Sequence, residues 1–360
     1  MGGFTPQTPH QERNAPGPAC MVSKGPRPKV GSRAKPWWIC RQVQDRRDMG
    51  EIHQLILRHG RDAAKQLVSP EERRLVDIAA QVLACDDSGI GVTYSGFCLT
   101  ALPHKRLAED EIWERKTPRI TLLVEPGHFY EGETRRLFGV PYGSRARLIL
   151  LYLQTQAVRT NSPEVELGPS MRAWMERMGV QAGGKNYREI REQSARLSAC
   201  RLTFFWPTSE GRGRGFSKES IVESGIQLYD LEDEDGQARL WVDTVRLSSS
   251  FYRALKEHPV PIWEPAVKQI SNQSMASDVY IWLSYRLHVL DRQTSVTWTA
   301  LHGQFGAGYK LIRQFKPRFI DSLQMAMAVY PEARITINET GLVLHPSPPP
   351  IPERELRRLL

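Results

Sequence analysis

Residues 169–206 read PSMRAWMERMGVQAGGKNYREIREQSARLSACRLTFFW, and this stretch decides the expected fold. Methionine and tryptophan recur over 169–178 at the spacing of one helix face, which predicts a short helix. The glycines at 183–184 predict a turn, because glycine interrupts regular structure. A second helix is expected over about 186–200. The stretch therefore predicts two helices joined by a tight turn.

A strand and a basic hairpin are expected after the second helix. The strand is expected at 202–206, a glycine-rich loop with arginines occupies 210–215, and a partner strand is expected at about 219–229. Helix, turn, helix, strand, glycine-rich hairpin and strand is the order of elements in a winged helix-turn-helix. Such a domain binds duplex DNA with its second helix in the major groove.

The same order recurs nearer the C-terminus. A helix is expected at about 274–290, and it precedes a strand, a small helix, a glycine turn and a long helix. Pro317 must kink or split the long helix, because proline has no N–H to donate within it. These further elements are expected at 296–298, 298–305, 306–308 and about 309–329, with a closing hairpin at 334–337 and 342–344.

The expected fold class is therefore α+β, with two winged helix-turn-helix domains in tandem. Helices at about 50–67 and 70–84 and strand-like segments over 90–125 form an extension before the first domain, and a strong helix begins near Leu148. The expected organisation is a basic, proline-rich, disordered arm at 1–48, the extension at 49–130, the first domain at 131–262, the second domain at 263–346, and a basic, proline-rich tail at 347–360.

Positive charge is concentrated at the N-terminal end of the chain. The 360 residues carry a formal net charge of +9. Residues 1–50 hold nine basic and three acidic side chains, which accounts for +6 of that charge. A basic, proline-rich segment is typical of a solvated disordered arm, and also of an arm that binds phosphate without reading sequence. Both interpretations stay open at this point.

Composition argues against several classes of protein. No run of about 18 apolar residues occurs, so neither a membrane span nor a membrane partner is expected. The five cysteines are odd in number and form no C-x-x-C pair, which disfavours a disulfide framework and a zinc module. A reducing cytoplasm fits this cysteine pattern best.

The second helix of the first domain has one apolar face. With Ile190 toward the core, helical geometry places Ser194 and Leu197 beside it and arginines and alanines opposite or on the flanks. Small side chains among guanidinium groups permit close approach to base edges. The alternative is a solvated helix face with salt bridges such as one between Arg188 and Glu192. The expected DNA contacts on this helix and its hairpin are Lys185, Asn186, Arg188, Arg191, Ala195, Arg196, Arg212, Arg214 and Lys218.

The long helix of the second domain follows the same logic. Residues 309–318 include four cations and no acid, while apolar side chains further along form the core stripe. An acidic stretch at 230–236 would repel phosphate, so it is expected to face away from DNA, to meet a basic partner surface, or to be a solvated turn. The expected DNA contacts on the long helix are Lys310, Arg313, Gln314, Lys316 and Arg318.

Residues 179–186 contain the pattern G-x-x-x-x-G-K of a phosphate-binding loop. A helix instead of a strand is expected before it, and Asn186 stands where serine or threonine would bind magnesium. The turn of a helix-turn-helix is therefore the preferred interpretation. The nine histidines form no metal-binding pattern, so no catalytic residue, metal or cofactor is expected.

Several motifs together resemble the plasmid-encoded RepA replication proteins of bacteria. One motif is EGETRRLFGVPYGSRAR at 131–147, which leads into the helix near Leu148. The resemblance covers roughly residues 70–350 and leaves out the basic arm. The other motifs are RLTFFW at 201–206, LSSSFY at 247–252, HPVP at 258–261, and the segment 315–319 that leads to VYP at 329–331.

The resemblance implies a plasmid replication initiator that is not an enzyme. Such a protein would bind repeated duplex DNA sites at the plasmid origin through both winged helices, in the manner of iteron-binding initiators. It would help to open the adjacent DNA and recruit the host initiator and the replicative helicase, and a homodimer is a further expected assembly. Two alternatives stay open, a winged-helix transcriptional repressor that controls its own gene and a DNA-processing enzyme.

Overall fold

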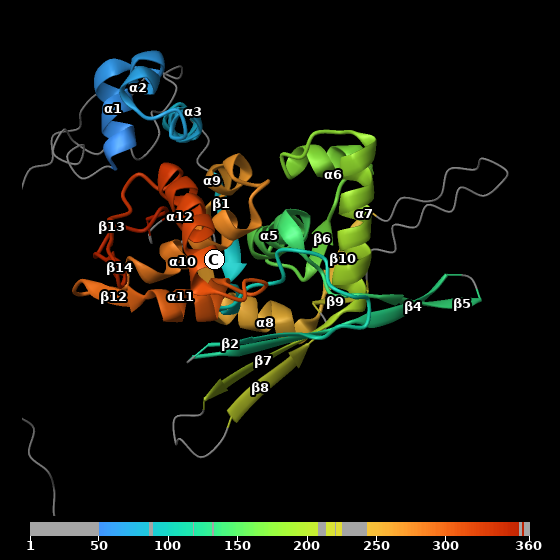
Figure 1. Cartoon of the computed structure of the whole chain (residues 1–360). Helices are drawn as coiled ribbons and strands as arrows, with labels where there is room; N and C mark the ends of the chain where they lie inside the picture. Colours follow the sequence, from blue (N-terminus) through green and yellow to red (C-terminus); the bar gives the residue numbers. More distant parts are fainter. Residues whose placement is uncertain are drawn as a thin grey trace, which may run out of the picture. The chain divides into compact units, whose positions relative to one another are not determined.

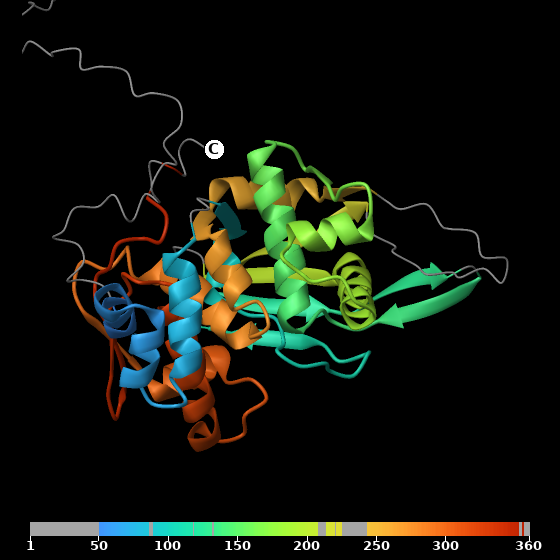
Figure 2. The ribbon, with the colours of Figure 1, turned by 90° about the horizontal axis from the view of Figure 1, so that it is seen from above.

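The computed structural model of the chain describes residues 50–85, 89–117, 119–131, 133–207, 214–219, 221–224, 243–352 and 355. The chain divides into the units Met1–Lys35 and Pro36–Leu360, and every described residue belongs to the second unit. The expected arm at 1–48 and the acidic stretch at 230–236 lie outside the described residues. The described part is a mixed α/β protein (Figure 1; Figure 2).

Three short helices open the described part, namely α1 (Glu51–His59), α2 (Arg61–Leu67) and α3 (Arg73–Leu83). The sequence predicted one continuous helix over 50–67. Gly60, between α1 and α2, instead has a φ of +80°, a backbone conformation that glycine adopts without strain and that ends α1. The prediction of one helix is therefore wrong, and the glycine explains the break.

The buried His53 of α1 fastens this helix to the end of α12 (Ile312–Ala328). Its Nε2 donates a hydrogen bond of 2.9 Å to the carbonyl oxygen of Ala328, and its Nδ1 has no hydrogen-bond partner within the described part of the chain. Burial lowers the pKa of His53 to about 4, and the hydrogen bond to Ala328 opposes this shift only partly. The imidazole is therefore neutral at pH 7.

We expect His53 to make the fold less stable in mild acid. The unfolded chain binds a proton near the ordinary histidine pKa of about 6.5, whereas the folded chain resists protonation until about pH 4. The contribution of His53 is thus complete above pH 6.5 and is lost as the pH falls toward 4. Urea unfolding at pH 7 and pH 5 should show that the wild type loses about 2 kcal/mol more than His53→Leu does. Equal losses in the two proteins would contradict this expectation.

Three helices and three strands between residues 143 and 247 form what we call the first motif. They are α5 (Gly143–Arg159), β6 (Glu164–Glu166), α6 (Met171–Arg177), α7 (Gly184–Ala199), β9 (Val222–Ser224) and β10 (Thr244–Leu247). The helices α6 and α7 lie where the sequence predicts two helices around a turn, and Trp174, Met175 and Ile190 are buried as expected. The strands pair antiparallel in the order β6-β10-β9, so the last strand lies in the middle.

The second motif, between residues 274 and 344, repeats this arrangement. It consists of α10 (Ser274–Arg286), β12 (Thr294–Thr297), α11 (Trp298–Phe305), α12, β13 (Ile335–Ile337) and β14 (Gly341–Leu344). Its strands pair in the order β12-β14-β13, again with the last strand in the middle. Pro317 was predicted to kink or split this helix, and it lies inside α12, which runs on without a split.

The strand that follows α7 belongs to a separate four-stranded antiparallel sheet. This sheet contains β2 (Trp113–Lys116), β3 (Thr121–Glu125), β7 (Arg201–Pro207) and β8 (Arg214–Glu219), in that order. The partner of β7 is thus at 214–219 instead of about 219–229, and residues 222–224 pair with β10. The basic hairpin therefore lies at the edge of this sheet, which the order of elements alone could not indicate.

A hairpin that the sequence did not predict lies against the C-terminal end of α7 (Figure 1). It is formed by β4 (Gly127–Glu131) and β5 (Thr134–Phe138). A Cβ atom added at Gly127 would lie 1.8 Å from the carbonyl oxygen of Ala199, a distance that no side chain can occupy. The absence of a side chain at Gly127 therefore lets β4 approach the backbone of α7.

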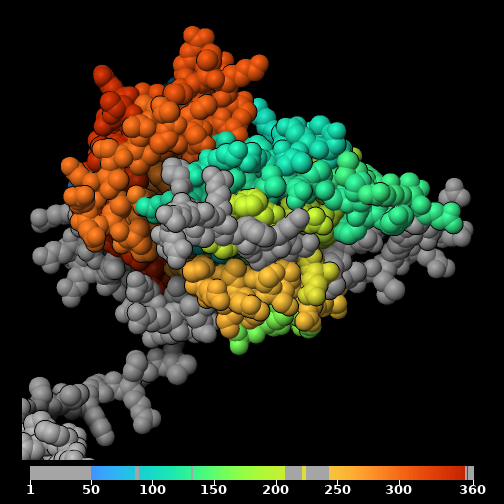
Figure 3. Space-filling model, turned by 90° about the horizontal axis from the view of Figure 1, so that it is seen from below, coloured from blue at the N-terminus to red at the C-terminus, as the bar shows by residue number. Residues whose placement is uncertain are grey.

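The two motifs share one hydrophobic cluster of buried side chains. Between them, β1 (Ile90–Tyr94) pairs with β11 (Pro259–Trp263), and α4 (Ser95–Leu99) contacts α10. Figure 3 shows the second motif, in orange, beside the segment that contains β2 and β3, and Arg115 of β2 donates to the Gln304 carbonyl oxygen at 3.1 Å. The remaining helices are α8 (Ser249–Glu257) and α9 (Glu264–Gln269).

A buried ion pair joins the first helices of the two motifs. Arg147 of α5 donates from Nε and Nη2 to the two carboxylate oxygens of Asp278 of α10, each at 2.6 Å. Its guanidinium also donates to the carbonyl oxygens of Leu102, Pro103 and Gly143 at 2.7, 3.2 and 2.8 Å. The hydrogen-bond donors of Arg147 thus have acceptors in three segments of the chain. Because one of these acceptors is Asp278 of α10, the contacts hold α5 against α10.

Candidate nucleic-acid interface

The N-terminal half of α7 presents two exposed cations. Lys185 and Arg188 are both exposed. Lys185 Nζ lies 3.8 Å from the carboxylate of Glu189, an exposed pair that contributes little to stability. Arg188 makes no ion pair within the described part of the chain. Its guanidinium is therefore available to an anion outside the protein, such as a phosphate.

Asn186 helps to hold the turn before α7. Its amide nitrogen donates to the carbonyl oxygen of Gln181 at 2.9 Å, and its amide oxygen accepts from Arg145 Nη2 at 2.8 Å. Arg145 of α5 also pairs with Glu189 at 3.0 Å. These contacts fix the start of α7 on α5, so the structure gives the side chain of Asn186 a positioning role at the exposed end of α7.

The structure corrects the expectation for Ala195 and Arg196, because both are buried. Arg196 donates to Glu109 at 2.6 Å and to Glu192 at 3.1 Å, and its guanidinium lies 5.2 Å from the centre of the Tyr142 ring. The helix-face argument considered only the core on the Ile190 side of α7. The hairpin β4–β5 and the segment 139–142 cover the other side, which removes Ala195 and Arg196 from the surface.

The carboxylate that meets Arg196 is held in its charged form. Partial burial by itself would raise the pKa of Glu109, but hydrogen bonds from Arg106, the Gly139 N–H and Arg196 outweigh that effect and lower it to about 2. The distances are 2.8 Å to the Gly139 nitrogen and 2.6 Å to Arg196. Arg196 therefore belongs to a charged cluster that anchors the C-terminal half of α7.

The structure gives different kinds of information about the other expected contacts of the first motif. Arg191 is half-buried. Arg214 and Lys218 belong to β8, where their backbones pair with Pro207 and Thr203. Arg212 lies outside the described residues. Lys185 and Arg188 are thus the two cations of this set whose exposure the structure shows.

In the second motif, the expected contacts gather around the first turn of α12. Lys310, Arg313, Gln314 and Arg318 are exposed. Lys316 is half-buried, and its ammonium group lies 4.7 Å from the centre of the Trp298 ring. Lys316, which was expected to contact DNA, therefore makes a cation–π contact within the motif. The structure therefore brings three polar side chains together at 310–314 and sets Lys316 apart.

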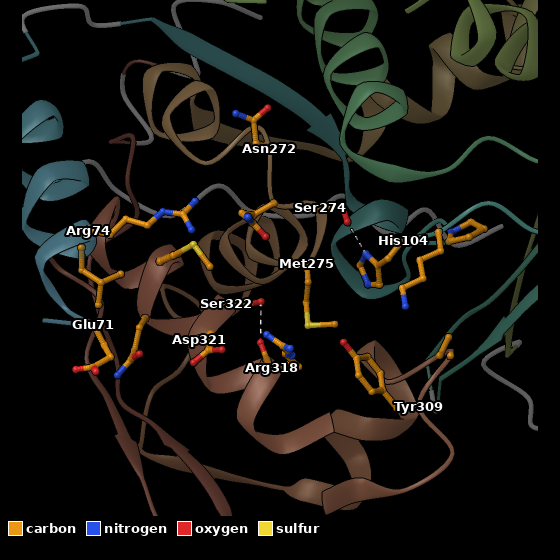
Figure 4. Close-up of a pocket in the computed structure, with 18 of the residues that line it drawn as sticks. Glu71, Arg74, His104, Asn272, Ser274, Met275, Tyr309, Arg318, Asp321 and Ser322 are labelled. Atoms are coloured by element: carbon orange, nitrogen blue, oxygen red, sulfur yellow. Dashed lines mark hydrogen bonds between the residues drawn. The ribbon is translucent and has the colours of Figure 1, made fainter. Parts of the chain in front are cut away.

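Arg318 lines a hollow of about 660 Å³ beside α12 (Figure 4). Figure 4 shows Tyr309 and Asp321 in the same hollow. The cationic side chains of the lining are matched by an equal number of acidic ones, so the charged groups there carry no net formal charge. The charged residues of the lining are Arg74, Lys105, Arg318, Glu71, Glu72 and Asp321.

A second hollow of about 420 Å³ lies at the start of α7 and includes Lys185 and Asn186 in its lining. His104 and Asn272 line both hollows, so the two meet at these residues. The N-terminal end of α7 and the part of α12 between residues 318 and 325 therefore line adjoining hollows.

Sequence reasoning missed Arg145 and Lys105. Arg145 stands within the motif at 131–147, but its contact with α7 depends on the packing of two helices and gives no signal in the sequence. Lys105 is an exposed cation next to His104 in the hollow beside α12, and a lone lysine in a loop carries no pattern. Only the tertiary arrangement identifies either residue.

Two features are absent from the described residues. No group of three or more His, Cys, Asp or Glu side chains there could hold a metal ion. No helix in the part of the chain that the structure describes is long and apolar enough to span a bilayer.

Comparisons with known proteins found distantly similar solved structures. The structure is similar to a crystal structure of SeMet derivatives of domain2 and domain 3 of RctB, with a TM-score of 0.42 and 12% identity over 62% of this chain and 80% of that one. A crystal structure of RctB domains 2-3 matches with a TM-score of 0.39 and 13% identity over 63% and 81% of the two chains. No curated protein matches the sequence.

The family model described as "Plasmid encoded RepA protein" matches residues 140–300, from the segment after β5 to the start of α11. This region includes most of the first motif and the beginning of the second. The match confirms the resemblance in the sequence: residues 140–300 of this chain are similar to the plasmid-encoded RepA proteins.

Proposed function

We propose that the chain is a plasmid replication initiator that binds duplex DNA at the plasmid origin through two winged helices. The observation that carries the proposal is the repeated order helix, strand, helix, helix, hairpin, with the third strand in the middle of both small sheets. This is the order in which a winged helix places its second helix of the turn against the major groove and its hairpin beside it. The proposed boundaries of the two domains are 131–262 and 263–346.

In this proposal, α7 and α12 are the helices that enter the major groove. Lys185 and Arg188 contact DNA from α7, while Arg313 and Gln314 contact it from α12 and Lys310 from the turn just before α12. Lysine and arginine supply phosphate contacts that position the protein, and arginine and glutamine also form paired hydrogen bonds with guanine and adenine. Their exposure at the N-terminal ends of the two helices supports this assignment.

The hairpins β9–β10 and β13–β14 are the proposed wings. The β7–β8 hairpin, which carries Arg214 and Lys218, is a further proposed phosphate contact of the first domain. The role is non-enzymatic, since binding repeated sites and helping to open the adjacent duplex require no catalytic residue. The proposed partners are the origin DNA, the host initiator, the replicative helicase and a second copy of the chain.

Replacing Arg188 and Arg313 together by alanine should weaken duplex binding and reduce its salt dependence. Each phosphate contact contributes about 0.9 to the slope of log K against log salt, so the slope should fall by up to about 2. Both side chains are exposed, so the melting temperature should not change. Arg58→Ala on α1 is the matched control, because Arg58 is also exposed and its hydrogen bond is to Gln54.

Fluorescence anisotropy over a range of salt concentrations measures the slope, and footprinting on the encoding plasmid shows where the protein binds. Protection of tandem repeats supports the initiator, whereas protection of a single promoter palindrome favours the repressor. If the double variant keeps the wild-type affinity and slope, the assignment of α7 and α12 is wrong.

A further inference from the structure

Two large apolar side chains lie exposed side by side at the start of α12. Leu311 is 45% exposed and Ile312 is 37% exposed. They stand between Lys310 and Arg313, which are also exposed. Large apolar groups that remain in water while charged groups surround them are typical of surfaces that meet a partner. The neighbouring charges restrict what that partner is.

The backbone at this point is fixed before any partner binds. His302 Nε2 donates to the carbonyl oxygen of Tyr309 at 2.8 Å, and the Tyr309 N–H donates to the carbonyl oxygen of Gly306 at 3.0 Å. Gly308 has a φ of +88°, a conformation that closes the turn and favours glycine. The Tyr309 ring also packs edge-on against Phe315, with 5.8 Å between ring centres. Leu311 and Ile312 are thus held in place by the turn.

The charge around the apolar pair matches a polyanion. No acidic residue occurs between 309 and 320, and the exposed cations Lys310 and Arg313 flank the pair directly. In the major groove of DNA, the one large apolar group is the C5 methyl of thymine, which lies between two phosphate backbones. A surface with an apolar centre and a cationic edge fits that environment, and an apolar protein partner would not require the cations.

We infer that Leu311 and Ile312 contact thymine methyl groups in the major groove and so help the second motif to select its site. This inference rests on the proposed function, because it requires α12 to enter the groove. An apolar contact with the thymine methyl group would add to the sequence preference that hydrogen bonds supply. Uracil forms the same base pair as thymine but lacks this methyl group, so the two bases separate the apolar contact from the hydrogen bonds. The prediction is that the protein distinguishes two duplexes that differ only in those methyl groups.

The test begins with duplexes that the full-length protein selects from a random pool. Each thymine of the selected site is then replaced by deoxyuridine, one position at a time, and the affinity is measured. At one or two positions the wild type should bind about fourfold more weakly, the factor expected for one buried methyl group. Leu311→Ala and Ile312→Ala should bind the thymine duplex more weakly and lose the difference between thymine and uracil at those positions.

Leu57→Ala on α1 is the control, because Leu57 is 41% exposed and lies outside the second motif. It should retain the thymine preference of the wild type. Binding that is equal for thymine and uracil at every position would overturn the inference while leaving the proposed function intact. Failure to select any duplex would refute the proposed function itself. A loss of self-association in Leu311→Ala, with thymine preference retained, would assign the apolar pair to a protein interface and overturn the inference.

Discussion

Arg147→Met should lower the free energy of unfolding by about 3–5 kcal/mol, the cost of leaving one member of a buried ion pair without its partner. Asp278 would lose both hydrogen bonds from Arg147, which are each 2.6 Å long. Burial already raises the pKa of Asp278, and the charge of Arg147 is the main opposing effect. Urea unfolding of the purified protein at pH 7 measures the loss.

The double variant Arg147→Met with Asp278→Leu distinguishes the charge from the packing. Replacing both members by apolar residues removes the unpaired carboxylate, so much of the lost stability should return. The carbonyl oxygens of Leu102 and Gly143 still lose the hydrogen bonds from Arg147, so recovery should remain incomplete. A double variant as unstable as Arg147→Met would show that the carboxylate is not the source of the loss.

Arg196→Ala should destabilise the protein by about 3 kcal/mol without any DNA present, because Arg196 is a buried member of a charged cluster. The substitution removes its hydrogen bonds to Glu109 and Glu192 and its contact with the Tyr142 ring. It also leaves a space between α7 and the segment 139–142. Thermal unfolding monitored by circular dichroism measures this effect.

The matched variant for Arg196→Ala is Arg188→Ala, on the same helix. Arg188 is exposed, so its removal should leave the melting temperature unchanged and weaken DNA binding instead. The two arginines lie eight residues apart on one helix, and replacing Arg196 should lower the melting temperature whereas replacing Arg188 should weaken DNA binding. Equal melting temperatures for Arg196→Ala and the wild type would return Arg196 to the list of candidate DNA contacts.

The local elements around the deciding stretch were predictable from the sequence. The spacing of Trp174, Met175 and Ile190 indicates which faces of α6 and α7 are buried, because their apolar partners belong to the same motif. In the second motif, the small helix before α12 and the closing hairpin also lie where the pattern predicts them. Short-range periodicity was sufficient for these elements.

What the sequence could not predict depends on contacts between distant segments. Arg196 reads as a flank of α7, but β4–β5 and Glu109 cover it, and these lie about sixty and ninety residues earlier. Likewise, β7 pairs with β3 and not with a strand of the first motif, and the sheet that a strand joins depends on distant segments. A helical wheel has no information about such neighbours, so it assigns every polar residue opposite the core to the surface.

The pairing of Arg147 with Asp278 has a consequence for how the molecule comes apart. The strand pair β1–β11 and a common hydrophobic cluster also connect the two motifs. Separating the two motifs would expose the charged pair and apolar surface at the same time, so unfolding of one motif should destabilise the other. The region from 143 to 344 should therefore denature as one cooperative block with a single heat-absorption peak, and proteolysis between the motifs should yield no folded fragment.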